Sequence, residues 1–394
     1  MPVSPGSLYP YVTTMTTLLS AVLLVVVGAV ADRHPRPQRL LGLVAGVGAL
    51  AASSMYFLQG AAWQLGVAQI MVASLCLGAT LVIYDGILCR IAGPDDRDRV
   101  SSRGWALGYV GGGLLLALNL ALLTLKGRLG LDTGTAVRVS LLSAGLWWGV
   151  FTLVPVLGLR DLPGRELVPD LPPQARGRGV GAGAFAQLGD TLRELRGHPQ
   201  TLLFLAAYLF FNDGIQTVIS ASSLYGSREL GMTDTQVLMT FLLVQVVAVG
   251  GALGFGRIAR RAGARRTVLG SLVVWTAVVA IAFFVPAGVF PAFAALGALI
   301  GIVMGGSQAL SRSLYSQLVP AGRESEFFSL YQAMERGTSW FGTLLFGLVQ
   351  QWTHSYRLSI LALVAFFVVG GILLARVDVR AGIRAAGNPE PLIV

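Results

Sequence analysis

The sequence predicts an all-α polytopic membrane protein, and three features lead to this fold class. Hydrophobic residues make up 54% of the 394 residues, and charged residues only 12%, about half the share that is usual in soluble domains. The mean hydropathy is +0.70. The apolar residues also come in long runs, and a run of about 20 residues crosses a bilayer as a helix. Lipid is therefore the main solvent of this chain.

Eleven apolar segments are long enough to span a bilayer. In lipid, backbone groups must be hydrogen-bonded within their own segment, so each segment is predicted to be a helix. In chain order they are 9–30, 40–58, 64–89, 104–124, 139–158, 199–223, 235–256, 267–285, 290–311, 327–350 and 357–375.

A polar segment rich in Pro, Gly and Arg separates five spans from six. The predicted organisation is an N-terminal bundle over 1–158, a linker over 159–198, a C-terminal bundle over 199–376 and a tail over 377–394. Within the linker, 188–195 has the pattern of a short amphipathic helix, but a plain linker explains it equally well.

The basic residues predict the orientation. Of the 29 Lys and Arg residues, 23 fall on one side of the predicted topology, and cytoplasmic loops carry such an excess. We expect a multi-pass protein of the cell (inner) membrane with a cytoplasmic C-terminus. The same pattern explains the net charge of +10 without a nucleic-acid partner, since the cations lie in short loops between spans.

Two loops on the predicted cytoplasmic side repeat one pattern, a glycine four residues before a charged pair and then further arginines. The residues of the pattern are Gly28, Asp32 and Arg33 in the first loop, and Gly256, Arg260, Arg261 and Gly263 in the second. Glycine allows two helices to approach, and an acid can cap a neighbouring helix N-terminus. We interpret both as gating loops.

This pattern resembles the signature loop of the major facilitator superfamily. The resemblance implies a two-bundle fold that works by alternating access. The first copy lacks the second glycine, and the second has Arg260 where the acid belongs. Members usually have twelve helices, so the count of five plus six leads us to expect that the first helix, which lines the substrate path, is missing.

Three further stretches resemble the vacuole-effluxer family within that superfamily, which comprises the autophagy-related permeases and their bacterial relatives. The stretches run over 101–119, 211–217 and 305–313. The resemblance implies export or exchange of small solutes, and for the fungal members efflux of amino acids. The chain departs from the family at Asp85, where Asn is common, and at Glu335 and Arg336, where Gly and Lys are common.

Charged side chains inside spans are costly and are therefore functional candidates. The candidates for substrate binding or coupling are Asp85, Asn212, Asp213, Gln216, Gln308, Arg312 and Glu335, with Arg336 beside the last. A cavity with these side chains could bind a zwitterion, Arg312 facing its carboxylate and Asp213 its ammonium. The alternatives are an Asp–Arg pair that only holds helices together, and an Arg312 that extends to the headgroups.

Proton coupling is a further hypothesis. Burial at lipid depth favours the neutral form of a carboxyl group, so Asp213 or Asp85 could take up and release a proton during transport. Gly104, Gly108 and Gly112 share one helix face, and Gly297, Gly301 and Gly305 share another. Both spacings predict close helix packing.

Other classes of protein find less support. The chain has no phosphate-binding loop pattern, its two cysteines and three histidines have no metal-ligand spacing, and no cofactor is predicted. A membrane-embedded enzyme would need clustered acid, base and nucleophile, whereas the charges here are scattered. A transport-incompetent remnant or partner protein that lacks its first helix is the other alternative.

Overall fold

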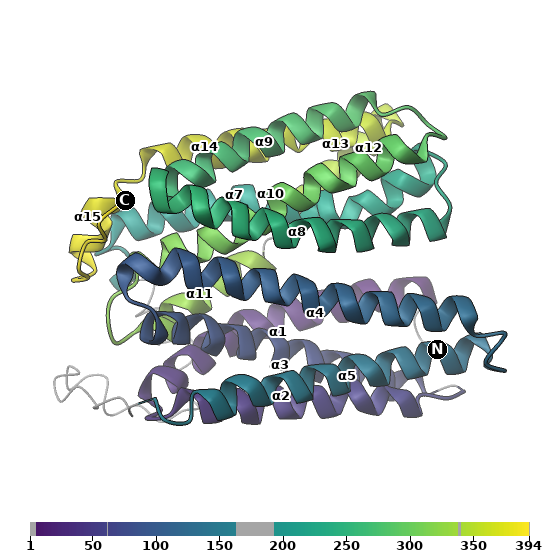
Figure 1. The fold of residues 1–394 in the computed structure, drawn as a ribbon, viewed down its shortest axis with the longest axis horizontal. Helices are drawn as coiled ribbons and strands as arrows, with labels where there is room; N and C mark the ends of the chain where they lie inside the picture. Colours follow the sequence, from purple (N-terminus) through teal and green to yellow (C-terminus); the bar gives the residue numbers. More distant parts are fainter. Residues whose placement is uncertain (1–4, 61, 163–192, 338–339, 394) are drawn as a thin grey trace. The chain divides into compact units, whose positions relative to one another are not determined.

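The computed structural model describes residues 5–60, 62–162, 193–337 and 340–393. Over these residues all regular structure is helical (Figure 1). The predicted all-α membrane class is therefore confirmed.

Ten stretches of the described chain are long and apolar enough to cross a membrane. Nine are built on the single long helices α1 (Pro5–Arg33), α2 (Pro37–Ser54), α3 (Trp63–Ile91), α4 (Arg97–Leu125), α5 (Thr133–Gly158), α7 (Pro199–Leu224), α8 (Asp234–Ala262), α9 (Ala264–Phe284) and α10 (Phe290–Gln317). The tenth, Tyr356–Arg376, consists of α13 (Tyr356–Ala362) and α14 (Val364–Arg376). Each matches a predicted span.

The predicted span 327–350 is not among these ten. The structure gives two 14-residue helices there, α11 (Glu324–Gly337) and α12 (Trp340–Thr353), with 338–339 outside the described residues. Half of the α11 residues are polar or charged, a composition that does not suit a helix facing lipid. Because 338–339 separate the two described helices, the span over 327–350 remains a prediction.

Packing divides the chain into two compact units that are discontinuous in sequence. Unit 1 contains 1–87, 117–194 and 322–337, and unit 2 contains 88–116, 195–321 and 338–394. This division does not follow the predicted bundles, whose boundaries remain a prediction. The predicted linker lies mostly outside the described residues, as does most of the segment 188–195.

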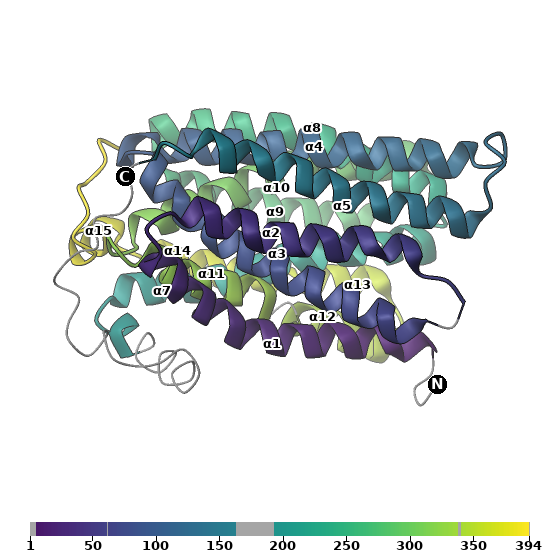
Figure 2. The same cartoon turned by 90° about the horizontal axis from the view of Figure 1, so that it is seen from below.

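In unit 1, α2 packs along α5 and α1 packs along α11 (Figures 1 and 2). Gly145 on α5 explains how close α2 and α5 come: a Cβ there would lie 2.4 Å from the backbone nitrogen of Ser53. The remaining face of α5 carries exposed Leu146, Val150 and Val154. In a membrane protein such an apolar face is covered by lipid.

In unit 2, α8 and α10 are in direct backbone contact. A Cβ on Gly301 would lie 2.8 Å from the carbonyl oxygen of Val244, and a Cβ on Gly305 would lie 2.3 Å from that of Ala248. No side-chain layer therefore separates these two backbones at Gly301 and Gly305. The predicted close packing of the glycine face on 297–305 is confirmed. On the other predicted glycine face it is not seen at Gly108, where a Cβ would meet nothing within 4 Å.

The C-terminal tail is ordered and belongs to unit 2. It forms α15 (Val379–Ala385) and then places Asn388 at the end of α10. The side-chain amide of Asn388 donates to the carbonyl oxygens of Gln317 at 2.9 Å and Val319 at 2.8 Å. These bonds occupy carbonyl groups that have no partner within the helix.

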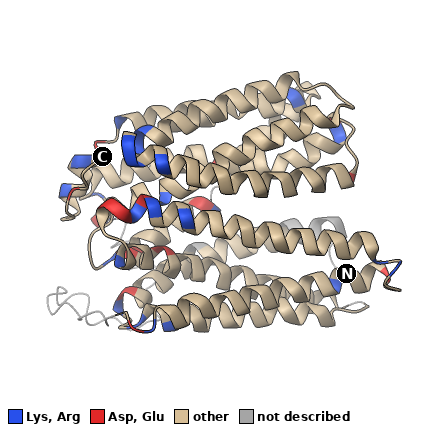
Figure 3. Ribbon diagram, in the orientation of Figure 1, with Lys and Arg blue, Asp and Glu red and all other residues tan. Residues whose placement is uncertain are grey.

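Charged residues in unit 2 gather at the same end as α15. Arg260 and Arg261 end α8 and Arg265 lies in the first turn of α9. After this first turn α9 carries no charged residue and is tan in Figure 3. The Arg265 guanidinium also donates to the carbonyl oxygens of Leu374 and Ala375. This end therefore lies at the polar edge of a bilayer.

The α8–α10 contact leads to a stability prediction. Gly305→Ala should destabilise the protein by about 1–3 kcal/mol, because its Cβ meets a backbone atom that cannot move aside. The matched control is Gly254→Ala on α8, where a Cβ would meet nothing within 4 Å. Thermal unfolding of both purified variants, followed by tryptophan fluorescence, checks this; equal midpoints would contradict the packing argument.

Candidate functional site

Three of the predicted residues form a cluster with Gln332 in unit 1. Asp85 on α3 is buried and accepts a hydrogen bond from the Gln332 side-chain amide at 2.9 Å. The same amide lies 3.5 Å from a carboxylate oxygen of Glu335. The guanidinium of Arg336 interacts electrostatically with Glu335 and Asp85. The charge of Asp85 is therefore partly compensated by a cation and an amide of α11.

Asp213 stands in a different environment in unit 2. Its side chain is 1% exposed, and one carboxylate oxygen accepts the backbone N–H of Gly342, in the first turn of α12, at 2.7 Å. Asp213 thus holds α7 against the beginning of α12.

Several buried polar atoms at and near Asp213 lack a hydrogen-bond partner among the described residues. Its other carboxylate oxygen, the side-chain nitrogen of Asn212 and the hydroxyl of Thr217 are buried without a hydrogen-bond partner among the described residues. Thr217 is directed at α12, since its hydroxyl oxygen would lie 2.2 Å from a Cβ on Gly342. Gln216, also predicted, is half-buried on α7.

Arg312 lies in a third place, the contact between α4 and α10 in unit 2. Its guanidinium donates to the hydroxyl of Ser101 at 3.0 Å and lies 5.9 Å from the ring centre of Trp105. Ser101 in turn donates to the carbonyl oxygen of Ala309 at 2.6 Å. These are the contacts of a residue that fastens two helices together.

The α4–α10 contact continues along both helices. Gln308, another predicted residue, accepts a hydrogen bond from the Tyr109 hydroxyl at 2.7 Å. Towards the end of α10, Arg97 donates to the carbonyl oxygen of Ser316 at 2.7 Å, and Ser313 donates to Asp98. Polar side chains therefore recur along this helix pair from Arg97 to Tyr109.

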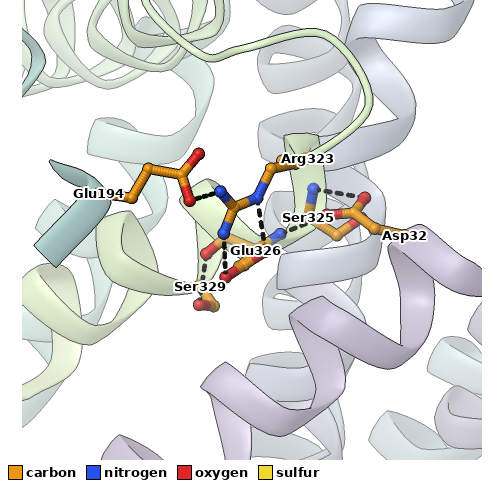
Figure 4. Close-up of polar contacts among 6 residues, drawn as sticks. All are labelled: Asp32, Glu194, Arg323, Ser325, Glu326 and Ser329. Carbon is orange, nitrogen blue, oxygen red and sulfur yellow. Dashed lines mark hydrogen bonds and ion pairs between the residues drawn. The ribbon is translucent and has the colours of Figure 1, made fainter. Parts of the chain in front are cut away.

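The first gating loop is built around the beginning of α11 in unit 1. The Asp32 carboxylate accepts the backbone N–H groups of Ser325 at 2.9 Å and Glu326 at 2.8 Å (Figure 4). A negative charge at a helix N-terminus is favourable because of the unpaired N–H groups and the helix dipole. Gly28 is required beside it, since a Cβ there would lie 2.6 Å from the Ser325 carbonyl oxygen.

A second ion-pair group surrounds the same helix end. Arg323 lies between the carboxylates of Glu194 and Glu326 (Figure 4), and two of its nitrogens contact Glu326 at 2.9 and 2.6 Å. Ser329 donates to the Glu326 carbonyl oxygen at 2.6 Å. Asp32 and Arg323 together fasten the beginning of α11 to α1 and to the helical residues around Glu194.

The second gating loop keeps the glycines but not the acid. Gly256 packs against Ser102, whose hydroxyl oxygen would lie 2.5 Å from a Cβ there. Gly263 joins α8 to α9 with φ of 85°, a conformation that favours glycine. Arg260 and Arg261 are exposed, as is Arg33 in the first loop. The acid-dependent contact is therefore seen only for Asp32 among the described loop residues.

The predicted polar residues do not line the cavity seen in unit 2. That cavity has a volume of about 320 Å³ and is apolar, with walls from α7, α8, α9 and α10. Its lining includes Phe241, Val279 and Phe293. Sequence reasoning also passed over Thr217 and Ser101, whose hydroxyls are common on apolar helices and gave no signal by themselves.

Comparison with known proteins decides the family. Residues 1–387 match the family described as "Vacuole effluxer Atg22 like". The chain belongs to this family. The predicted resemblance to this family is thereby confirmed.

Two relatives illustrate the range of the family. The chain is 27% identical to the uncharacterized MFS-type transporter YxiO of Bacillus subtilis, over 97% of this chain and 87% of that protein. It is 24% identical to autophagy-related protein 22-1 of Penicillium rubens, over 98% of this chain and 77% of that protein. The chain described here is thus an MFS-type membrane transporter and not an enzyme.

Solved structures show the same fold. The chain is similar to the Escherichia coli fucose:proton symporter FucP, with a TM-score of 0.69, 13% identity and coverage of 92% of this chain and 90% of that one. A bacterial homologue of the iron transporter ferroportin gives a TM-score of 0.63, with 17% identity and coverage of 94% and 89%. At such identities the likeness confirms the major-facilitator fold and leaves the solute open.

The contact of Asp32 with α11 leads to a second prediction. Asp32→Ala should destabilise this vacuole-effluxer family member by about 1 kcal/mol, the usual cost of losing a helix cap, because two N–H groups lose their acceptor. Asp161→Ala is the control, since Asp161 is exposed and forms its ion pair with its exposed neighbour Arg160. Amide hydrogen exchange of 324–330 should rise in the Asp32 variant alone; unchanged exchange there would show that the cap contributes nothing.

Proposed function

We propose that this protein is a secondary-active transporter that exports small solutes, amino acids among them, by alternating access across the cell (inner) membrane. The observation that carries the proposal is Asp213, a carboxyl group buried within a span of a major-facilitator fold and held by one backbone amide. Such groups mark substrate and ion pathways.

Proton coupling through Asp213 is part of this proposal. An ionised carboxylate is costly to bury unless a cation compensates it. Asp85 has Arg336 nearby, whereas no Lys or Arg pairs with Asp213 among the described residues. Proton uptake therefore removes a larger cost at Asp213, which makes it the better proton carrier of the two candidates.

Transport in proteoliposomes tests both parts. The full chain, reconstituted with a mixture of labelled neutral amino acids, should show accumulation that depends on an imposed proton gradient. Asp213→Asn cannot exchange a proton, so it should lose gradient-driven accumulation at least tenfold and keep solute exchange without a gradient. Asp85→Asn is the matched control and should keep gradient dependence; accumulation by the Asp213 variant equal to wild type would exclude this coupling.

We further propose a gating role for Arg312. Since its donors hold α10 to Ser101 on α4, it fastens one closed state of the path. Arg312→Lys keeps the charge but loses the fork geometry, so exchange should slow several-fold while solute affinity changes little. Ser101→Ala should produce the same change, and a large loss of affinity in either variant would favour direct solute binding instead.

The orientation proposal is tested separately. With the end that holds Arg260, Arg265 and α15 in the cytoplasm, a green fluorescent protein fused after Val394 should fluoresce, and a periplasm-dependent alkaline phosphatase fused there should be inactive. The opposite pair of results would reverse the orientation.

A further inference from the structure

We propose that the polar group at Asp213 is a binding site for the carboxylate of the transported solute, and that the Asp213 carboxylate occupies it when no solute is bound. This inference rests on the proposed transport function and adds the chemical class of the solute. It also replaces the sequence-based idea that Asp213 faces an ammonium group. The site consists of the Gly342 N–H and the Thr217 hydroxyl.

The chemistry of the site is shown by its present occupant. The Gly342 N–H already binds a carboxylate oxygen, that of Asp213, at 2.7 Å. The N–H and the carboxylate meet in the buried contact between α7 and α12. A free carboxylate has the same donor requirement as the Asp213 side chain, so it competes for the same amide.

More donors are present than Asp213 uses. Thr217 is 2% exposed, yet its hydroxyl has no hydrogen-bond partner among the described residues. A buried polar group without a partner costs about 1–3 kcal/mol. The Thr217 hydroxyl is directed at Gly342, to which it comes so close that any Cβ would collide with it. A solute carboxylate would satisfy this donor.

Asp213 and the solute then cannot both be charged at this site. When Asp213 takes up a proton, it becomes a weaker acceptor for the Gly342 N–H, and a solute carboxylate can displace it. The proton on Asp213 and the bound carboxylate form a pair with one negative charge in place of two. Solute binding and proton uptake are coupled by this competition, without a dedicated cation at the site.

A rescue experiment tests the site without knowledge of the solute. Asp213→Ala removes the internal carboxylate and leaves the Gly342 amide without its partner. In the purified full-length variant, millimolar acetate should raise the midpoint of thermal unfolding by several degrees in a saturable way. Sodium chloride at the same ionic strength and the neutral analogue acetamide should have no effect, and the wild type should not respond to acetate.

The donors can be removed in the same assay. Asp213→Ala combined with Thr217→Val should lose most of the acetate response. Combination with Thr276→Val is the matched control, because the Thr276 hydroxyl bonds the Leu272 carbonyl oxygen of its own helix, and it should keep the response. A folded Asp213→Ala protein that acetate does not stabilise, or that acetamide stabilises equally, would overturn the carboxylate site.

A second variant covers the case in which Asp213→Ala does not fold. Asp213→Asn keeps the side-chain shape but removes the charged competitor, so it should bind carboxylate-bearing amino acids several-fold more tightly than wild type and their amides no better. If Asp213 faces the ammonium group of the solute instead, Asp213→Asn should bind these amino acids at least tenfold more weakly than wild type. If no amino acid is transported at all, the amino-acid proposal fails while the acetate response still decides the site.

Discussion

The cost of burying charge at lipid depth is the constraint on which the rest of this structure depends. Each buried carboxylate on a helix must find donors, and the structure supplies them in two ways. Asp85 uses a side-chain amide and a nearby guanidinium on α11. Asp213 uses a backbone amide of α12. The second solution is the less complete one, which makes Asp213 the group most easily changed by a proton or a competing anion.

The two helices α11 and α12 follow one another in the chain, and an aspartate of another helix accepts a backbone N–H of each. Asp32 bonds two amides of α11 in unit 1, and Asp213 bonds one amide of α12 in unit 2. The Asp32 contact is reinforced by Gly28 and by the Arg323 ion pairs, whereas Asp213 has unpaired neighbours. We therefore assign the first to holding the fold and the second to the solute.

Much of the fold was predictable from the sequence. Ten spans, the close packing of the glycine face of α10 and the family followed from apolar run length, residue spacing and quoted motifs, because lipid imposes the same requirement on every span. The contact of Asp32 with a helix N-terminus was also expected from its motif.

The sequence by itself determined that this protein is a helical membrane transporter of the vacuole-effluxer family, and it selected the charged residues within the spans. Only the tertiary structure decided which of them meet. It placed Arg312 on Ser101, Asp85 with Gln332, and Asp213 on the Gly342 amide. The physical reason is that a hydropathy pattern records the cost of each buried charge, whereas its partner comes from a distant segment whose position depends on helix packing.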